Sequence, residues 1–227
     1  MILTAYRADD APSEQPEQHR LHLRRLDRAT LSADAVSTAR ALLGALLVRD
    51  DKTGRRVARI AETEAYAGPE DGASHTRAGR TARTAVMFGP PGHAYVYLVY
   101  GMHHCLNVVC GADGEAAAVL IRAVEPLEGV TLMRASRGAA GGGERLAAGP
   151  ARTCQALEVD RALDGIDLIE DERLWLAANP DGPIDPTRVL CGPRVGVDYA
   201  PEPWASRPWR FGLRDSGALS RPFPATR

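Results

Sequence analysis

Pairs of short apolar segments joined by tight turns constrain the fold of this chain more than any other feature. Leu46–Arg49 pairs in this way with Val57–Tyr66, and Ala94–Tyr100 pairs with Cys105–Cys110 through a turn at Gly101–His103. Strands joined by so few residues must run antiparallel, because a parallel connection needs a crossover of a dozen or more residues. The sequence therefore predicts an antiparallel sheet built from hairpins.

Helical segments are expected between and after these hairpins. Ser32 can cap a helix over Ala33–Leu43 that Gly44 ends, and Leu127–Ser136 forms a second. Gly149-Pro150 opens a third helix that runs to about Leu157. Helices interspersed among hairpins predict an α+β fold rather than a doubly wound sheet.

The remaining segments suggest a single domain. Further strands are expected at Ala117–Val124, closed by Glu125-Pro126, at Val189–Val197 and at Trp209–Leu213. A chain of 227 residues is long enough for one sizeable core. The polar residues 1–28 predict a loosely ordered tail, 29–215 the domain, and 216–227 a C-terminal tail, with a flexible loop at Gly138–Gly143.

Composition indicates a soluble globular protein. The chain is 44% hydrophobic and 25% charged, and it contains no apolar run of eighteen residues that could cross a membrane. Its start, Met1-Ile2-Leu3-Thr4, turns polar at once, unlike a signal peptide. Free thiols in a cytosolic protein are expected, because no CxxC spacing occurs among Cys105, Cys110, Cys154 and Cys191.

Positive charge is carried almost wholly by arginine, since Lys52, in the turn Asp51-Lys52-Thr53-Gly54, is the only lysine. A codon bias explains most of this scarcity, but not the density of arginine at Arg55, Arg56, Arg59, Arg77, Arg80 and Arg83. Arginine forks suit phosphate, while a net charge of −1 argues against indiscriminate nucleic-acid binding. Arg77, Arg80 and Arg83 would form one basic edge on a helical turn, or an ordinary solvated face.

The strand that ends at Tyr66 carries two glutamates. Strict alternation would place Ala58, Ile60, Glu62, Glu64 and Tyr66 on one face, apolar at first and then carboxylate and aromatic. A glutamate at the end of an apolar face is costly unless it is paired or used. Two interpretations stay open: the wet end of an edge strand, or a general base whose pKa partial burial raises.

Aromatic residues gather in the second hairpin. Tyr95 and Tyr97 alternate onto one face, which is usual for a core, whereas Tyr100 at the hairpin tip should be exposed and could wedge into a base stack. Arg122, at the end of an apolar strand, either reaches a carboxylate or extends to the surface. His75, alone in a loop, is typical of a surface or capping residue.

No metal or cofactor signature is present. His103 and His104 are adjacent, and Cys105 and Cys110 are five apart, so neither pair has zinc-ligand spacing on a regular strand. The sequence has no P-loop, no G-x-G-x-x-G and no G-x-S-x-G. We therefore expect an activity that needs neither metal nor cofactor.

A set of motifs nevertheless resembles a known family. They are Ala61-Glu-Thr-Glu-Ala-Tyr-Ala-Gly-Pro-Glu-Asp71, His75-x-Arg77-x-Gly79-Arg80, Met87-Phe88, Pro91-Gly92, Tyr95-Val-Tyr97-x-x-Tyr100-Gly-Met102, Asn107, Leu120-x-Arg122-Ala-x-Glu-Pro-Leu-Glu-Gly129, Gly149-Pro150 with Cys154-Gln155-Ala156-Leu157, and Arg194-Val-Gly-Val197. In this order and spacing the chain resembles the alkyladenine (3-methyladenine) DNA glycosylases of the methylpurine type. The resemblance spans most of residues 32–213.

The resemblance implies a single α+β domain with a curved, largely antiparallel sheet surrounded by helices. It implies a monomeric, monofunctional enzyme of the bacterial cytoplasm, associated with the nucleoid through DNA. The enzyme would flip damaged purines from double-stranded DNA and hydrolyse the N-glycosidic bond without cutting the strand. Expected bases are 3-methyladenine, 7-methylguanine, hypoxanthine and ethenoadenine. Glu64 would be the general base, with Arg122 and the main-chain carbonyl of Val195 holding the water.

The resemblance also assigns the pocket and the DNA contacts. Tyr66 and His75 would stack on one face of the base and Tyr97 on the other, while Asn107 would oppose the 2-amino group of guanine. Tyr100 would fill the space left in the duplex. DNA-binding residues would be Tyr100, Met102, Arg77 and Arg80.

Two alternatives remain from the residues alone. The first is a non-catalytic module that binds single strands on a platform of Tyr66, Tyr97 and Tyr100. The second is a metalloenzyme built on His75, His103, His104 and Cys105. Release of a base from an alkylated duplex separates the first from a glycosylase, and activity in excess chelator would remove the second.

Overall fold

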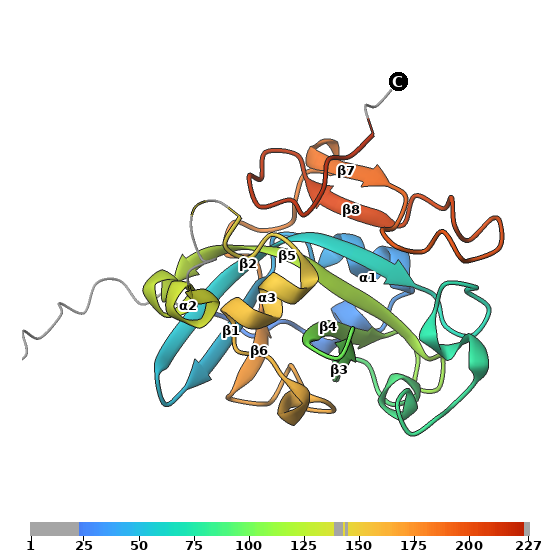
Figure 1. Ribbon diagram of the computed structural model, residues 1–227, viewed down its shortest axis with the longest axis horizontal. Helices are drawn as coiled ribbons and strands as arrows, with labels where there is room; N and C mark the ends of the chain where they lie inside the picture. Colours follow the sequence, from blue (N-terminus) through green and yellow to red (C-terminus); the bar gives the residue numbers. More distant parts are fainter. Residues whose placement is uncertain (1–22, 139–142, 144, 225–227) are drawn as a thin grey trace, which may run out of the picture.

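Both predicted hairpins are present in the computed structural model, which describes residues 23–138, 143 and 145–224. In this part of the chain the strands are β1 (Leu46–Asp51), β2 (Gly54–Tyr66), β3 (Ala94–Val99), β4 (His103–Cys110), β5 (Ala117–Glu128), β6 (Leu174–Ala177), β7 (Val189–Gly192) and β8 (Arg210–Leu213). Their order is β3-β4-β5-β2-β1-β6, β8 pairs with both β2 and β7, and every pairing is antiparallel. Figure 1 shows β7 and β8 above the long strands β2 and β5. The predicted α+β class, with a curved antiparallel sheet, is confirmed.

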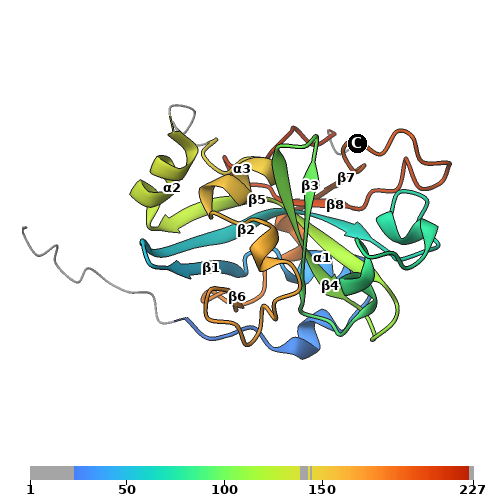
Figure 2. The same cartoon turned by 60° about the horizontal axis from the view of Figure 1, so that its bottom comes forward.

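The helices are shorter than predicted. They are α1 (Ala35–Ala41), α2 (Val130–Arg137) and α3 (Pro150–Ala156). Asp34 caps α1 in place of Ser32, because its carboxylate accepts hydrogen bonds from the amides of Val36 and Ser37. All three helices contribute to the largest apolar cluster, and Figure 2 shows α2 and α3 side by side.

A paired irregularity in the register of β2 and β5 sets which side chains face the site. Ile60 pairs with Val124 and Glu62 with Ala123, so Ala61 is an extra residue in β2; Thr63 then pairs with Ile121, which leaves Arg122 extra in β5. Each extra residue is a β-bulge that shifts the alternation of side chains by one position.

The predicted single face of β2 is therefore wrong. Ala58, Ile60 and Ala65 belong to the core cluster, and the hydroxyl of Thr63 donates to the Ala39 carbonyl of α1 on that same side. Strict alternation cannot place both Ile60 and Ala65 in one core. The bulge at Ala61 resolves this, and it turns the glutamates and Tyr66 to the opposite face.

Other strand boundaries also differ from the prediction. Asp51 pairs with Gly54, so the first hairpin has a two-residue loop. β5 continues through Glu125-Pro126 to Glu128. β4 pairs with β5 only as far as Leu120, so Pro126 lies where β2 is the only strand that pairs with β5 in the described part of the chain, and a proline is tolerated there. β7 ends at Gly192, so residues 193–197 form a loop. β6 was not predicted; its four residues show no alternation and are all buried.

The ends of the chain pack more closely than predicted, as far as they are described. Within the predicted tail 1–28, Leu26 is buried and Arg25 donates to the carbonyl of Ile169 and lies over Trp175. Residues 216–224 likewise contact the sheet, through Ser220 for example. Residues 1–22, 225–227 and most of the loop predicted at Gly138–Gly143 lie outside the described residues.

The four cysteines are free thiols, three of them buried, as expected. Among the helices in residues 23–138 and 145–224, none has the length and apolar character that a membrane span requires.

Candidate active site

A cavity of about 560 Å³ opens beside the β3–β4 hairpin. Its walls come from that hairpin, from β5, from the segment 73–75 and from the loop 195–197 that follows β7. Many of the residues singled out from the sequence line it: Tyr66, His75, Tyr97, Tyr100, Asn107, Arg122 and Val195. The fold thus gathers residues separated by more than a hundred positions into one site.

Glu64 lies behind the wall of this cavity and is fully buried. Its Oε1 accepts from the main-chain N–H of Val195 (2.7 Å) and is 3.1 Å from Arg122 Nη1; its Oε2 accepts from the Tyr66 hydroxyl (2.8 Å). An ionised carboxylate offers about four acceptor positions. These contacts use three of them, so roughly one remains for a water molecule that donates to Glu64.

Arg122 links the two glutamates of β2. Its Nε donates to Glu62 Oε1 (3.0 Å) while Nη1 contacts Glu64. Burial alone would lower the pKa of Arg122, but the negative charges of Glu64 and Glu62 outweigh it and raise the pKa above its ordinary value. The structure thus decides between the two interpretations of Arg122: the side chain reaches carboxylates and stays charged.

Tyr66 is held from both sides. Burial, followed by the charge of Glu64, raises its pKa well above the ordinary value, so the hydroxyl remains a hydrogen-bond donor to Glu64. The guanidinium of Arg194 lies 4.8 Å from the centre of the ring and pairs with Asp71, and neither of these side chains is exposed to solvent. The sequence motifs contained Arg194 and Asp71, but gave no reason to pair residues so far apart.

His75 and two tyrosines form one aromatic wall. The rings of His75 and Tyr97 meet edge to face with centroids 4.6 Å apart, and His75 Nδ1 lies 3.1 Å from the Tyr95 hydroxyl. Burial, then the charges of Arg83 and Arg77, lower the pKa of His75 to about 4, so the ring is neutral near pH 7. A planar base between two rings needs about twice the carbon contact distance of 3.5–4.0 Å. His75 and Tyr97 therefore belong to the same wall, not to opposite walls as the resemblance implied.

Comparison with known proteins identifies the family of this chain. The profile of the methylpurine-DNA glycosylase family matches residues 29–217. The chain belongs to the methylpurine-DNA glycosylase family. It is 50% identical over 200 residues to a putative 3-methyladenine DNA glycosylase of Anaeromyxobacter dehalogenans, covering 88% of each chain. It is also 44% identical over 209 residues to the human DNA-3-methyladenine glycosylase, covering 88% of this chain and 69% of the human protein.

Asn107 occupies the floor of the cavity in this glycosylase-family chain. It lies on β4 opposite Tyr95, and its Nδ2 donates to the Tyr95 carbonyl (3.1 Å). This bond uses one of the two N–H donors of Nδ2, so the nearly buried side chain keeps a second N–H and the acceptor Oδ1 for further hydrogen bonds. A group that enters beside Asn107 therefore meets both a donor and an acceptor.

The tip of the β3–β4 hairpin presents apolar side chains to solvent. Tyr100 is 89% exposed and Met102 69% exposed. Tyr100 and Gly101 both have positive φ, 52° and 68°, and the Met102 amide donates to the Val99 carbonyl, as in a type I′ turn. A tyrosine in the left-handed region costs about 1–2 kcal/mol. Backbone strain of this kind at an exposed aromatic residue is typical of a side chain with a functional role.

The predicted basic edge is not a helical edge. The 3₁₀ turn His75–Ala78 ends before Arg80, and three arginines lie over three different rings: Arg77 over Tyr199, Arg80 over Phe88 and Arg83 over Tyr97. The spacing of three was misleading because Gly79, with φ 82°, ends the turn. Arg83 lines the cavity, where the sequence had not placed it.

The residues of the metalloenzyme alternative do not converge. In the described part of the chain no three histidine, cysteine or acidic side chains are grouped so that they could hold a metal ion. His75 faces Tyr95 and Tyr97, whereas His103 and His104 lie on β4. That alternative therefore has no ligand set among His75, His103, His104 and Cys105.

Proposed function

We propose that this chain is a monofunctional DNA glycosylase that releases alkylated or deaminated purines from double-stranded DNA. The 3-methyladenine, 7-methylguanine, hypoxanthine and ethenoadenine class is its substrate, and base excision repair is the process it starts. The observation that carries the proposal is Glu64: a buried carboxylate, fixed by Arg122 and the Val195 amide, behind an aromatic cavity in a chain of this family.

Glu64 acts as general base in this proposal. A water bound at its free acceptor position, and held by the Val195 carbonyl, attacks C1′ of the flipped nucleotide. The water oxygen bonds to C1′, the C1′–N bond breaks with its electron pair passing to the purine, and the water proton passes to Glu64. Arg122, whose pKa is raised by the charges of Glu64 and Glu62, keeps a positive charge 3.1 Å from the Glu64 carboxylate during this step.

The base binds between Tyr66 on one side and the His75–Tyr97 wall on the other. Alkylated purines such as 3-methyladenine are cationic, so they stack favourably on electron-rich tyrosine rings. A neutral His75 adds no opposing charge to that wall. Shape and charge, rather than one hydrogen-bond pattern, then select the substrate. Asn107 limits access of guanine by crowding its 2-amino group.

Incubation with defined duplexes tests the function. Each duplex carries a single lesion, and the released base is identified by mass. Release of 3-methyladenine, with an abasic strand as the other product, is the expected result. Binding of DNA without release of any base would support the non-catalytic stacking module instead. Undamaged duplexes of the same sequence serve as controls.

Tyr100 is the wedge that occupies the space left by the flipped nucleotide, with Met102 beside it, while Arg77 and Arg80 contact phosphates. Tyr100→Asn should separate this role from stability, because asparagine tolerates the left-handed conformation at φ 52°. The melting temperature should stay equal or rise. Extrusion, followed with a fluorescent base analogue, should fall while duplex affinity changes less, since phosphate contacts supply most affinity. Unchanged extrusion would move the wedge role to Met102.

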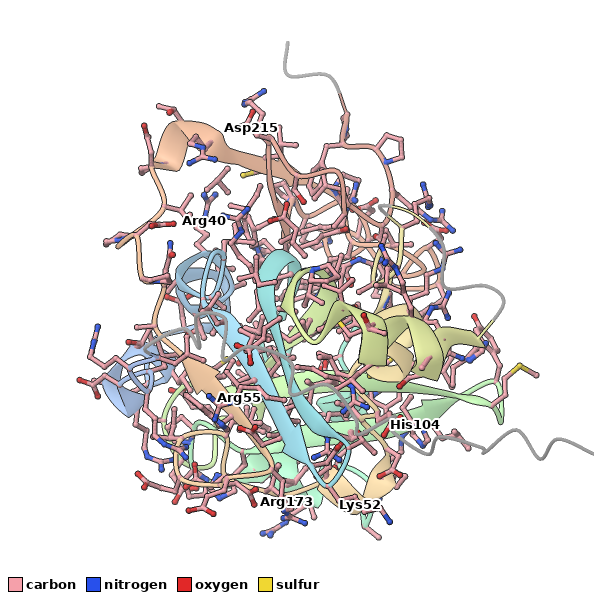
Figure 3. The ribbon with its side chains drawn as sticks, turned by 90° about the vertical axis from the view of Figure 1, so that its left-hand side faces the viewer. Arg40, Lys52, Arg55, His104, Arg173 and Asp215 are labelled. Carbon is pink, nitrogen blue, oxygen red and sulfur yellow. The ribbon has the colours of Figure 1, made fainter. Side chains whose placement is uncertain are left out.

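The product should be an intact abasic strand. A glycosylase that also cuts the strand needs an amine to form a Schiff base. Lys52, the only lysine, lies at the exposed tip of the β1–β2 hairpin, at the opposite end of the molecule from Asp215 beyond β8 (Figure 3). Glu64 lies towards the other end of β2, where that strand pairs with β8. It is ten residues along the strand from Gly54, which corresponds to roughly 33 Å at 3.3 Å per residue.

Borohydride added during turnover should therefore trap no covalent protein–DNA adduct. Lys52→Ala should release base at the rate of the unaltered protein. An adduct that disappears in Lys52→Ala would contradict hydrolysis by water alone.

A further inference from the structure

The chain beyond β8 returns to the buried carboxylate of Glu62. The main-chain N–H of Ser220 donates to Glu62 Oε2 (2.5 Å) and its hydroxyl donates to Glu62 Oε1 (2.8 Å). The same hydroxyl accepts from Arg122 Nη2 (3.0 Å). A hydroxyl has one proton to donate and lone pairs to accept, so both contacts can exist together. Ser220 lies just beyond the family-matched range, which ends at residue 217.

Contacts with Arg210 also hold this C-terminal segment beside Glu62. Arg210 Nη1 donates to Glu62 Oε1 (3.0 Å) and to the Arg221 carbonyl (3.2 Å), and its Nη2 donates to the Pro222 carbonyl (2.9 Å). The Phe223 ring lies 3.8 Å from the Arg210 guanidinium. Two buried carboxylates are thereby balanced by two buried guanidinium groups, Arg122 and Arg210.

The orientation of Arg122 follows from these contacts. Its Nε meets Glu62, its Nη2 meets Ser220 and its Nη1 meets Glu64. A planar guanidinium that is hydrogen-bonded at two of its nitrogens cannot turn freely, so the direction of its third nitrogen is fixed. The two restraining contacts both depend on the Glu62–Ser220 pair.

We infer that Ser220 is a positioning residue, which acts through Arg122 to hold the contact between Arg122 Nη1 and Glu64. The inference rests on the proposed glycosylase function. It extends the working active site from the β-sheet into a C-terminal segment that the sequence predicted to be a tail. Without the Ser220 hydroxyl, Arg122 loses one restraint and Glu62 loses one donor, while the cavity that binds the base keeps its lining.

Ser220→Ala tests this in the full-length chain. The single-turnover rate of 3-methyladenine release should fall about tenfold, as expected when a hydrogen bond to a charged group is lost. Affinity for a duplex with an abasic-site analogue should change less than twofold, because Ser220 does not line the cavity. Ser220→Thr keeps the hydroxyl and should recover most of the rate. Ser216→Ala is the matched control, since that hydroxyl accepts from the Ala218 amide in the same segment and, among the described residues, contacts neither glutamate of β2.

The outcomes separate cleanly. A slower rate with unchanged affinity, recovered by threonine, supports positioning. An unchanged rate in Ser220→Ala overturns the inference. A parallel fall of rate and affinity that follows loss of folded protein, measured by circular dichroism, also overturns it and makes Ser220 a structural residue. If the unaltered chain releases no base from any lesion duplex, the proposed function itself fails, whatever the Ser220 variants do.

Discussion

Glu64→Gln should slow base release by roughly two to four orders of magnitude, the usual contribution of a general base. Glutamine keeps the shape of the side chain and an oxygen that can accept from the Val195 amide and Arg122. It loses the ability to take a proton from water. Release should be measured under single-turnover conditions, so that the chemical step is not hidden by slow product release.

Two further measurements show whether a slower rate reflects the loss of the base itself. Affinity of Glu64→Gln for an abasic duplex should survive, because the aromatic cavity and the hairpin tip are intact. Glu125→Gln is the matched control: that carboxylate also pairs with an arginine, Arg59, on neighbouring strands of the same sheet, but it lacks the contacts of Glu64 with the cavity-lining residues Arg122, Tyr66 and Val195. Near-normal turnover of Glu64→Gln would remove Glu64 from the chemical step.

The sequence predicted the positions of the strands better than it predicted which face of the sheet their side chains occupy. Turn spacing predicted β1 to β4 to within a few residues, since short loops leave antiparallel pairing as the only geometry. The bulges at Ala61 and Arg122 could not be predicted, because each depends on the register between two strands some sixty positions apart. Without them, alternation would have turned Glu64 to the same side as Ile60, into the core.

The candidate site shows the same division. Glu64, Tyr66, Arg122 and Tyr100 could be singled out because a carboxylate on an apolar run, or an aromatic at a hairpin tip, is unusual in itself. Ser220 could not, because a serine in a polar tail has no local signature, and its contacts with Glu62 exist only once β8 has folded back. The spacing of residues along the sequence cannot identify a residue whose role depends on a contact with a distant part of the chain.

Asp71→Asn should destabilise the fold by about 3–5 kcal/mol, the usual result of leaving one member of a buried ion pair without its partner. Both oxygens of Asp71 accept from Arg194, and neither side chain is exposed to solvent. For a chain of this size such a loss corresponds to a fall in melting temperature of about 6–20 °C. Asp215→Asn is the matched control, because its pair with Arg188 is 64% and 51% exposed and should contribute under about 1 kcal/mol.

The buried pair should matter to activity beyond its effect on stability. Arg194 also donates to the carbonyls of Ala65 and Trp204, so it joins the end of β2, which carries Tyr66, to the loops that contain Asp71, Val195 and Trp204. The apolar contacts between these loops are few: Ala73, Val197 and Ala200, with Tyr66 and Trp204 packed against them. Loss of the ion pair should therefore open the loops locally before the sheet unfolds.

Hydrogen exchange and single-turnover kinetics, both measured at a temperature below the melting transition of the variant, can detect this local opening. Amides of residues 67–74 and 193–200 should lose protection in Asp71→Asn while those of β2 and β5 keep it, and base release should slow although the protein is folded. A lower melting temperature with unchanged hydrogen-exchange protection and an unchanged rate of base release would mean that the Asp71–Arg194 pair contributes to global stability alone. Arg194→Met and the double variant complete a cycle: if the pair acts as a unit, the double variant should lose less stability than the sum of the single changes.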